Sequence, residues 1–184
     1  MKADFQMPQR FVDPAAVTTH MHLREGDIVA DFGAGSGYFA TALTTAVGES
    51  GLVYAVEVQK NLVEKIGDLA RSKGLGQLQI IWGDIEEIGG TKIGTEALDA
   101  AIMVNTFFQC EDKNAALAEV WRALRSGGKF FIIDWSESFG GLGPQPNEVV
   151  SEPEATALCE SFGFVLERTF PAGGHHYGIA CRKP

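Results

Sequence analysis

The most informative part of the sequence is a run of seven residues, Asp31-Phe32-Gly33-Ala34-Gly35-Ser36-Gly37. It overlaps the end of an apolar segment, residues 28–32, that reads as a buried strand, and it leads into a segment with helical spacing, residues 36–47. Glycines at alternate positions let the backbone pass close to a ligand, and the N-terminus of a helix presents unpaired N–H groups. The run therefore predicts a strand-to-helix turn that binds a polar ligand.

Beyond this run, strand-like segments continue to alternate with segments of helical periodicity. Further strands are predicted at residues 52–58, 78–82, 98–104 and 129–135. Two of the intervening helices are predicted to end at glycines, one near Gly74 and one at Gly127 and Gly128. Such alternation is typical of a parallel sheet with helices on its faces.

The C-terminal part of the chain has a different pattern. After a helix predicted at residues 152–162, two strand-like segments, 164–170 and 177–181, are separated only by residues 171–176. This connection is too short for a helical crossover, so the two strands must form an antiparallel hairpin. The predicted fold class is α/β: a Rossmann-like, doubly wound sheet of seven strands, mostly parallel, with an antiparallel C-terminal hairpin strand.

The length of 184 residues suits a single domain with one buried core. Residues 27–184 carry the alternating pattern, and residues 1–26 are predicted to be an N-terminal extension that forms a partial lid. The first ten residues lack the apolar stretch of a signal peptide, and no apolar run approaches the length of a membrane span. We therefore expect a cytoplasmic protein.

Charge and cysteine content narrow the class of partner. A formal net charge of −9 argues against a nucleic-acid surface, because affinity for phosphates rests on clustered Lys and Arg. The three cysteines are far apart and in no metal-ligand spacing, so we expect reduced thiols and no metal site. Small molecules are the expected partners.

Carboxylates at the ends of the predicted strands indicate what the glycine turn binds. Glu57, at the end of the second strand, can accept hydrogen bonds from a ribose diol, and Val58 can cover a base. Asp31 precedes the first glycine, and Gly83-Asp84-Ile85 after the third strand offers a carboxylate for an adenine amino group and an apolar side chain for its ring. Together these residues indicate a nucleoside cofactor.

With these motifs the sequence resembles the class I S-adenosylmethionine-dependent methyltransferases. The resemblance is strongest to the small ubiquinone/menaquinone-biosynthesis-like (methyltransferase type 11) group and covers roughly residues 25–183. It includes the glycine run, the acidic position Glu57 and the Gly83-Asp84 pair. It also includes the Leu124-x-x-Gly127-Gly128-Lys129 approach to the fifth strand and the terminal hairpin.

The resemblance implies S-adenosylmethionine as the cofactor and a role for each motif. The glycines would approach the methionine part, and Asp31 would face its ammonium group, directly or through water. Glu57 would hold the ribose, Asp84 would meet the adenine amino group, and Ile85 would pack on the ring. The cofactor-binding residues expected are Asp31, Gly33, Gly35, Gly37, Glu57, Val58, Asp84, Ile85 and Asn105.

The resemblance also implies methyl transfer to a small-molecule acceptor. A sulfonium is an activated methyl donor, so the protein mainly aligns the acceptor and, where needed, removes a proton. The acceptor is expected beyond the carboxyl ends of the fourth and fifth strands. The catalytic residue is unknown; the candidates are Asn105, Asp134, His175 and His176.

Two other functions stay open at this point. The spacing Gly35-x-Gly37-x-x-Ala40 also satisfies the dinucleotide fingerprint, so an NAD(P)-dependent oxidoreductase is an alternative, although it would want a second domain for its substrate. The chain could also be a non-catalytic module that binds S-adenosylmethionine. A homodimer is conceivable, because a second subunit could complete so small a lid.

Overall fold

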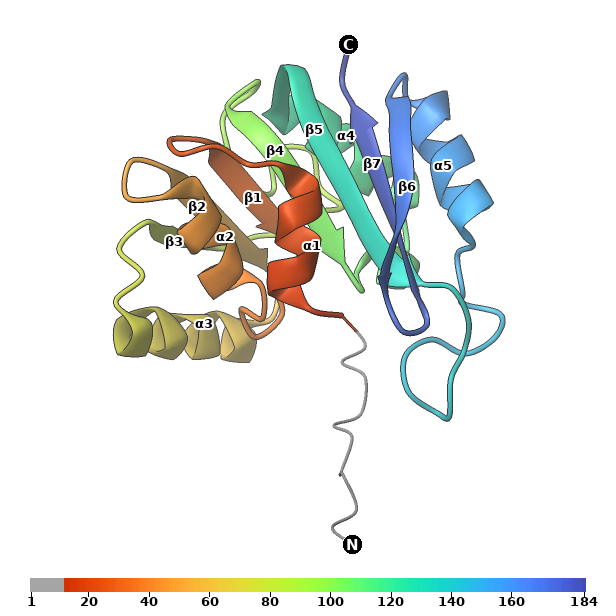
Figure 1. Cartoon of the computed structure of the whole chain (residues 1–184), viewed down its shortest axis with the longest axis horizontal. Coiled ribbons are helices and arrows are strands. Elements are labelled where there is room, and N and C mark those ends of the chain that lie inside the picture. Colours follow the sequence, from red (N-terminus) through yellow and green to blue (C-terminus); the bar gives the residue numbers. More distant parts are fainter. Residues whose placement is uncertain (1–11) are drawn as a thin grey trace, which may run out of the picture.

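A computed structural model describes residues 12–184 and contains one seven-stranded sheet. The strands follow the order β3-β2-β1-β4-β5-β7-β6 across the sheet (Figure 1). Strand β7 runs antiparallel to both β5 and β6, and the remaining pairs are parallel. The strands are β1 (Ile28–Phe32), β2 (Leu52–Glu57), β3 (Leu78–Trp82), β4 (Leu98–Val104), β5 (Leu124–Trp135), β6 (Val165–Gly173) and β7 (His176–Arg182). The predicted fold class is confirmed.

Helices cover both faces of the sheet, as a parallel sheet requires. Helices α1, α2 and α3 share one hydrophobic cluster with the sheet, and α4 and α5 share a second cluster on the other face. The elements are α1 (Pro14–Met21), α2 (Ala40–Val47), α3 (Lys60–Lys73), a 3-10 turn η1 (Phe107–Gln109), α4 (Lys113–Ala123) and α5 (Glu152–Ser161).

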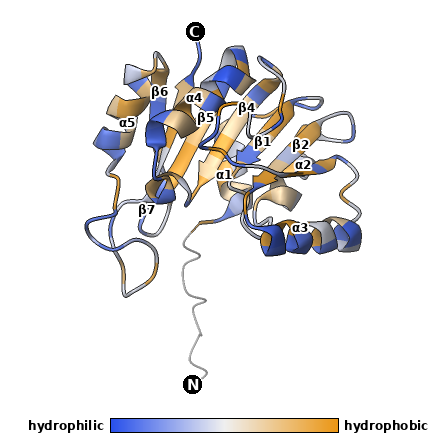
Figure 2. Ribbon diagram, turned by 180° about the vertical axis from the view of Figure 1, so that it is seen from behind, coloured by the Kyte–Doolittle hydropathy of each residue, from blue (hydrophilic) through white to orange (hydrophobic). Residues whose placement is uncertain are grey.

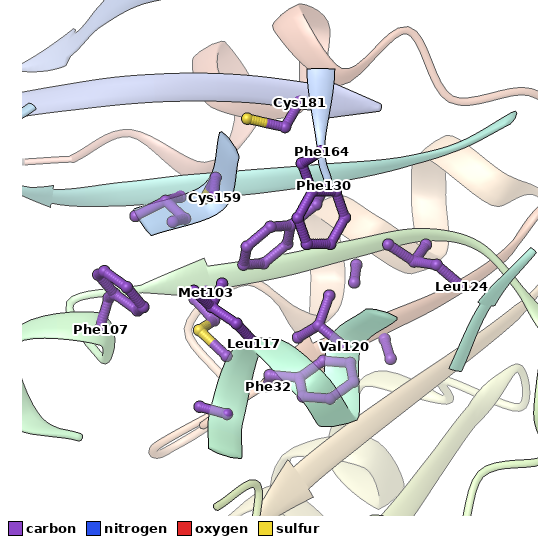
Figure 3. Packing of buried hydrophobic residues seen from close by; sticks show 14 of the residues in the cluster. Phe32, Met103, Phe107, Leu117, Val120, Leu124, Phe130, Cys159, Phe164 and Cys181 are labelled. Atoms are coloured by element: carbon purple, nitrogen blue, oxygen red, sulfur yellow. The ribbon is translucent and has the colours of Figure 1, made fainter. Parts of the chain in front are cut away.

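The core lies against the central strands, which are apolar along most of their length (Figure 2). On the α4 and α5 face the aromatic rings of Phe130 and Phe164 lie 5.5 Å apart between centroids and pack over Leu117 and Val120 of α4 (Figure 3). Strands β4 and β5 are buried on both faces, which explains why their sequences read as continuous apolar runs.

The structure corrects the predicted start of the first core helix. Helix α2 begins at Ala40 and not at residue 36, because Gly33, Gly35 and Gly37 all have positive φ angles, of 88°, 56° and 84°. Left-handed residues at alternate positions cannot continue a right-handed helix. The glycine run is therefore a separate loop between β1 and α2.

The structure also corrects the junction between α4 and β5. Helix α4 ends at Ala123, four residues before Gly127, and β5 begins at Leu124 with an irregular register against β4. Lys183 packs at this junction and donates from Nζ to the carbonyls of Trp121 and Leu124, at 2.9 and 2.8 Å. A cation at the last carbonyls stabilises a helix end.

The terminal hairpin is present, with longer strands than predicted. Residues 171–173 continue β6 through a register shift, so that only Gly174 and His175 connect it to β7. At the other end of the chain, α1 buries Val17 and Met21 in the core. A lid formed by residues 1–26 stays a prediction, and residues 1–11 lie outside the described residues.

The packing inside the hairpin generates a test of the fold. A Cβ on Gly178 of β7 would lie 2.4 Å from the buried ring of Phe170, whereas a Cβ on Gly76 would meet no atom within 4 Å. We expect Gly178→Ala to lower the free energy of unfolding by about 1–3 kcal/mol through overpacking. Gly76→Ala should change it little. Urea denaturation of both variants checks this, and equal stabilities would show that the hairpin accommodates the extra methyl group.

Candidate functional site

The largest collection of predicted site residues lines one pocket at the carboxyl ends of β1, β2 and β4. The chain runs outward from β1 through β2 to β3 and then returns to β4 on the other side of β1, so the pocket lies at the switch point of the sheet. Its volume is about 540 Å³, within the range of small-molecule sites. The lining includes Asp31, Gly33, Gly35, Glu57, Val58, Asp84, Ile85 and Asn105.

The three glycines of the loop have different roles. A Cβ on Gly35 would meet nothing within 4 Å, so this residue leaves open space in the pocket. A Cβ on Gly33 would lie 2.5 Å from the side chain of Thr106, and one on Gly37 would lie 3.0 Å from Leu69 of α3. Gly37 does not line the pocket. It packs against α3, and its contact with a cofactor stays a prediction.

Glu57 connects the glycine loop to the end of β2. Its Oε2 accepts a hydrogen bond from the backbone N–H of Gly35, and its Oε1 accepts one from the N–H of Gln59, both at 2.9 Å. The residue is buried, with 5% of its surface exposed. These two bonds fix the orientation of the carboxylate and leave further lone pairs for a ligand.

Asp31 is a buried carboxylate with an unsatisfied oxygen. It is 4% exposed and lines the pocket, and its Oδ1 has no hydrogen-bond partner among the described residues. Burial raises the pKa of Asp31 to about 7, and the neighbouring charge of Glu57 adds to the increase. An unsatisfied buried acceptor of this kind is costly unless a ligand supplies a donor.

The other end of the pocket is formed by the residues after β3. Asp84 and Ile85 line it, and Asp84 Oδ1 accepts a hydrogen bond from the N–H of Glu86 at 2.8 Å. Val58 faces the same pocket with 54% of its surface exposed. A carboxylate and two apolar side chains therefore meet here, as the sequence predicts for a base-binding end.

The candidates for acceptor chemistry do not all reach the pocket. Asn105 lines it and has a left-handed backbone, with φ of 53°. Its Oδ1 lies 2.8 Å from Nε2 of His176, a buried residue whose pKa is lowered by burial. His176, His175 and Asp134 are not among the lining residues. His175 pairs through Nδ1 with Glu137 at 2.6 Å.

Asp134 has a structural role at the end of β5. Its two oxygens accept hydrogen bonds from the N–H groups of Phe108 and Trp135, at 2.9 and 2.8 Å, and so hold η1 against the sheet. Burial raises the pKa of Asp134 to about 6, although these backbone bonds oppose the increase. The sequence identified the residue as polar and at a strand end, but could not show that its two oxygens bond backbone N–H groups and that it does not line the pocket.

Several lining residues were not among the expected cofactor-binding residues, although Ala34, Ser36 and Gly83 belong to the motifs quoted from the sequence. They are Ala34, Ser36, Tyr38, Phe39, Val56, Gln59, Leu62, Gly83, Glu86, Val104, Thr106, Gln109 and Cys110. Most lie within three residues of a predicted position, so proximity to the motifs was an available signal. Gln109 and Cys110 had none, because η1 brings them back over the pocket.

Comparison with known proteins identifies the family. A family model described as a methyltransferase domain matches residues 30–132, more than half of the chain. The chain belongs to this family. A crystal structure of a SAM-dependent methyltransferase from Aquifex aeolicus superimposes with a TM-score of 0.85 and 29% sequence identity, covering 93% of this chain and 89% of that one. The predicted resemblance is confirmed, and membership implies S-adenosylmethionine as the cofactor of the methyltransferase domain.

Two curated relatives indicate the range of chemistry near this sequence. The arsenite methyltransferase of Homo sapiens is 30% identical over 78% of this chain and 43% of the human protein. The ubiquinone/menaquinone biosynthesis C-methyltransferase UbiE of Haemophilus ducreyi is 24% identical over 62% of this chain and 44% of that protein. The chain thus spans less than half the length of either relative. Within residues 12–184, helices long and apolar enough to cross a membrane do not occur.

The buried carboxylate of Asp31 makes stability depend on pH in a defined direction. Its pKa of about 7 in the folded protein exceeds the ordinary value of 3.8, so the folded state holds this proton more tightly than the unfolded chain. The contribution of Asp31 to the free energy of unfolding therefore falls as pH rises from about 4 to 7 and is lowest above 7.

We expect Asp31→Asn to remove this contribution. The variant should gain stability over the wild type as pH rises from 5 to 8, by roughly 2 to 4 kcal/mol at ~1.4 kcal/mol per pKa unit. Urea denaturation of both proteins at several pH values measures the difference. A difference that stays constant across this range would contradict the raised pKa.

Proposed function

We propose that this domain transfers a methyl group from S-adenosylmethionine to an uncharged small-molecule acceptor. The observation that carries the proposal is the buried, unsatisfied Oδ1 of Asp31 in a pocket that also holds Glu57, Asp84 and the open position at Gly35. A single pocket thus offers an acceptor for an ammonium group, an acceptor for a diol and an acceptor for an adenine amino group.

The residues present fit the ammonium, ribose and adenine groups of S-adenosylmethionine. Asp31 would accept from the ammonium group, and Gly33 and Gly35 would let the methionine part approach the loop. Glu57 would accept from the ribose hydroxyls with an orientation already fixed by Gly35 and Gln59. Asp84 would receive the adenine amino group, with Val58 and Ile85 on the ring. Gly37 is not included, because it packs against α3.

The cofactor supplies an activated methyl group on a sulfonium, so the chain itself has two roles. The first is alignment of the acceptor, because in-line approach accounts for much of the rate. Asn105 would align the acceptor, since its N–H bonds the carbonyl of Ile133 at 2.9 Å and its carboxamide is held by His176. The second role is exclusion of water, for which the exposed Tyr38 at the pocket edge is suitably placed.

The charges of the pocket favour an acceptor without negative charge. Four carboxylates line it, Asp31, Glu57, Asp84 and Glu86, and its described lining contains no Lys or Arg. Lys113 lies behind η1 and donates to the carbonyl of Cys110 at 2.8 Å. A carboxylate or phosphate acceptor would add a further anion to that of the cofactor's own carboxylate in a site of low dielectric constant, which is unfavourable.

The cysteines argue against arsenite as the acceptor. A soft centre such as As(III) prefers thiolate ligands. Only Cys110 of the three cysteines lines the pocket, and burial raises its pKa to about 12, so it remains a thiol. Cys159 and Cys181 lie in the core on the α4 and α5 face (Figure 3). The pocket is therefore better suited to a carbon, nitrogen or oxygen acceptor.

Family membership favours this function over an NAD(P)-dependent oxidoreductase. A non-catalytic module remains the competing proposal, and a cytoplasmic location and a homodimer remain predictions. Incubation of the protein with methyl-labelled S-adenosylmethionine and a metabolite extract separates an enzyme from a module. Labelled small molecules would support methyl transfer, and their absence alongside tight S-adenosylhomocysteine binding would support the module.

Gly35 and Gly37 provide a test of the cofactor site. Gly35→Ala places a methyl group in open pocket space, so the affinity for S-adenosylhomocysteine should fall at least tenfold while left-handed strain costs about 1–2 kcal/mol of stability. Gly37→Ala should destabilise the fold by a similar amount but leave the affinity within twofold. Calorimetry and thermal melting on the same preparations measure both. Equal affinities in the two variants would place the cofactor elsewhere.

The proposal predicts that the protein methylates acceptors without a negative charge faster than matched anionic acceptors. Among pairs of small molecules that differ only in one carboxylate, methyl transfer to the uncharged member should be at least tenfold faster. Glu87→Gln should leave this preference unchanged, because Glu87 is exposed outside the pocket. A wild-type preference for the anionic members would overturn the assignment.

A further inference from the structure

A buried ion pair on α4 holds the loop that follows β3. Glu119 has no exposed surface, and its Oε2 accepts a hydrogen bond from the backbone N–H of Gly89 at 2.7 Å. Its Oε1 accepts from the hydroxyl group of Thr91 and, at 2.7 Å, from Arg122. Arg122 also donates to the carbonyl of Ile93 at 2.8 Å. The pair therefore connects one helix to three positions of the loop.

The side chain of Glu119 is ionised. Burial alone would raise the pKa of Glu119, but hydrogen bonds from Arg122, Thr91 and Gly89 outweigh it and hold the pKa below its ordinary value. Buried ion pairs add little net stability compared with apolar residues of the same size. A role in fixing the position of the loop explains better why a charge occupies the apolar side of α4, between Ala116 and Ala123.

The same loop carries the residues at the base-binding end of the pocket. Asp84 and Ile85 lie near the start of this loop and line the pocket. The backbones of Gly83 and Gly90 are in close contact, because a Cβ on Gly83 would lie 2.4 Å from the carbonyl oxygen of Gly90. A shift of Gly89 or Thr91 would therefore be transmitted to Gly83 and Asp84 through backbone contact.

We propose that Glu119 is a positioning residue for nucleobase recognition: it holds the loop of residues 83–93 so that Asp84 and Ile85 select adenine. This inference rests on the proposed binding of S-adenosylmethionine in this pocket. Glu119 itself does not line the pocket. Its effect acts on the base more than on the ribose, because the carboxylate of Glu57 is held by the N–H groups of Gly35 and Gln59. The loop meets Glu57 at the backbone, where the N–H of Gly83 donates to the carbonyl of Glu57 at 3.1 Å.

The test compares two ligands that differ at one position of the base. These are S-adenosylhomocysteine and its 6-deamino analogue, in which a hydrogen atom replaces the amino group. The wild type should prefer the amino compound by at least tenfold, because the deamino ring has no N–H group to donate to the carboxylate of Asp84. In Glu119→Gln the preference should fall below threefold, and amide hydrogen exchange at Gly89 and Thr91 should accelerate.

Two further variants keep the test decisive. Thr91→Val removes one hydroxyl group from the same network with little change in shape, and it should reduce the preference if Glu119→Gln does not fold. Arg125→Gln breaks the partly exposed pair with Asp99 near the end of α4 and should leave both affinities unchanged. An equal loss of affinity for both ligands in the first two variants would overturn the positioning role. A wild type that binds neither ligand would overturn the proposed cofactor as well.

Discussion

The hydrogen bond from the N–H of Gly35 to the carboxylate of Glu57 is the contact that gives this site its shape. It is reinforced by two backbone bonds, from Gly33 and Ala34 to the carbonyl of Val56, at 3.0 and 2.9 Å. The loop after β1 is thereby attached to the end of β2 at three points. Because β1 and β2 are parallel neighbours, both ends lie at one edge of the sheet, and the pocket opens between this loop and the end of β4.

The attachment of the glycine loop to β2 brings energetically unfavourable groups together in the pocket. Asp31 and Glu57 bring two carboxylates into a poorly solvated site, and Asn105 holds a left-handed backbone that only a few non-glycine residues tolerate. Such features persist where the surrounding structure determines them and where a ligand compensates for them. A cationic ligand that donates hydrogen bonds would compensate for the buried carboxylates of Asp31 and Glu57, which supports the proposed binding of S-adenosylmethionine in this pocket.

The two faces of the sheet contribute to the site in different ways. On one face, α3 packs against the glycine loop through the contact of Leu69 with Gly37. On the other face, α4 reaches the loop after β3 through Glu119 and Arg122, and Lys183 of the C-terminus completes the last turn of α4. Helices that are far apart in the sequence thus support the two ends of the pocket, and the central sheet fixes the positions of these helices relative to each other.

The sequence by itself determined the features that depend on local order along the chain. Strand and helix alternation, the hairpin inferred from the short connection of residues 171–176, and the positions of Asp31, Glu57 and Asp84 at strand ends all follow from residue spacing, because parallel strands end at the same edge. The family resemblance rested on these same motifs.

Only the tertiary structure decided which of the similar residues line the pocket. Gly35 and Gly37 look equivalent in sequence, and the packing of α3 gives them different roles. Asp134 lies in the last residues of β5 and Asn105 follows β4, yet one side chain holds η1 and the other lines the pocket. The physical reason is common to these cases: side-chain direction and partners depend on contacts between segments distant in sequence, and no local spacing specifies them.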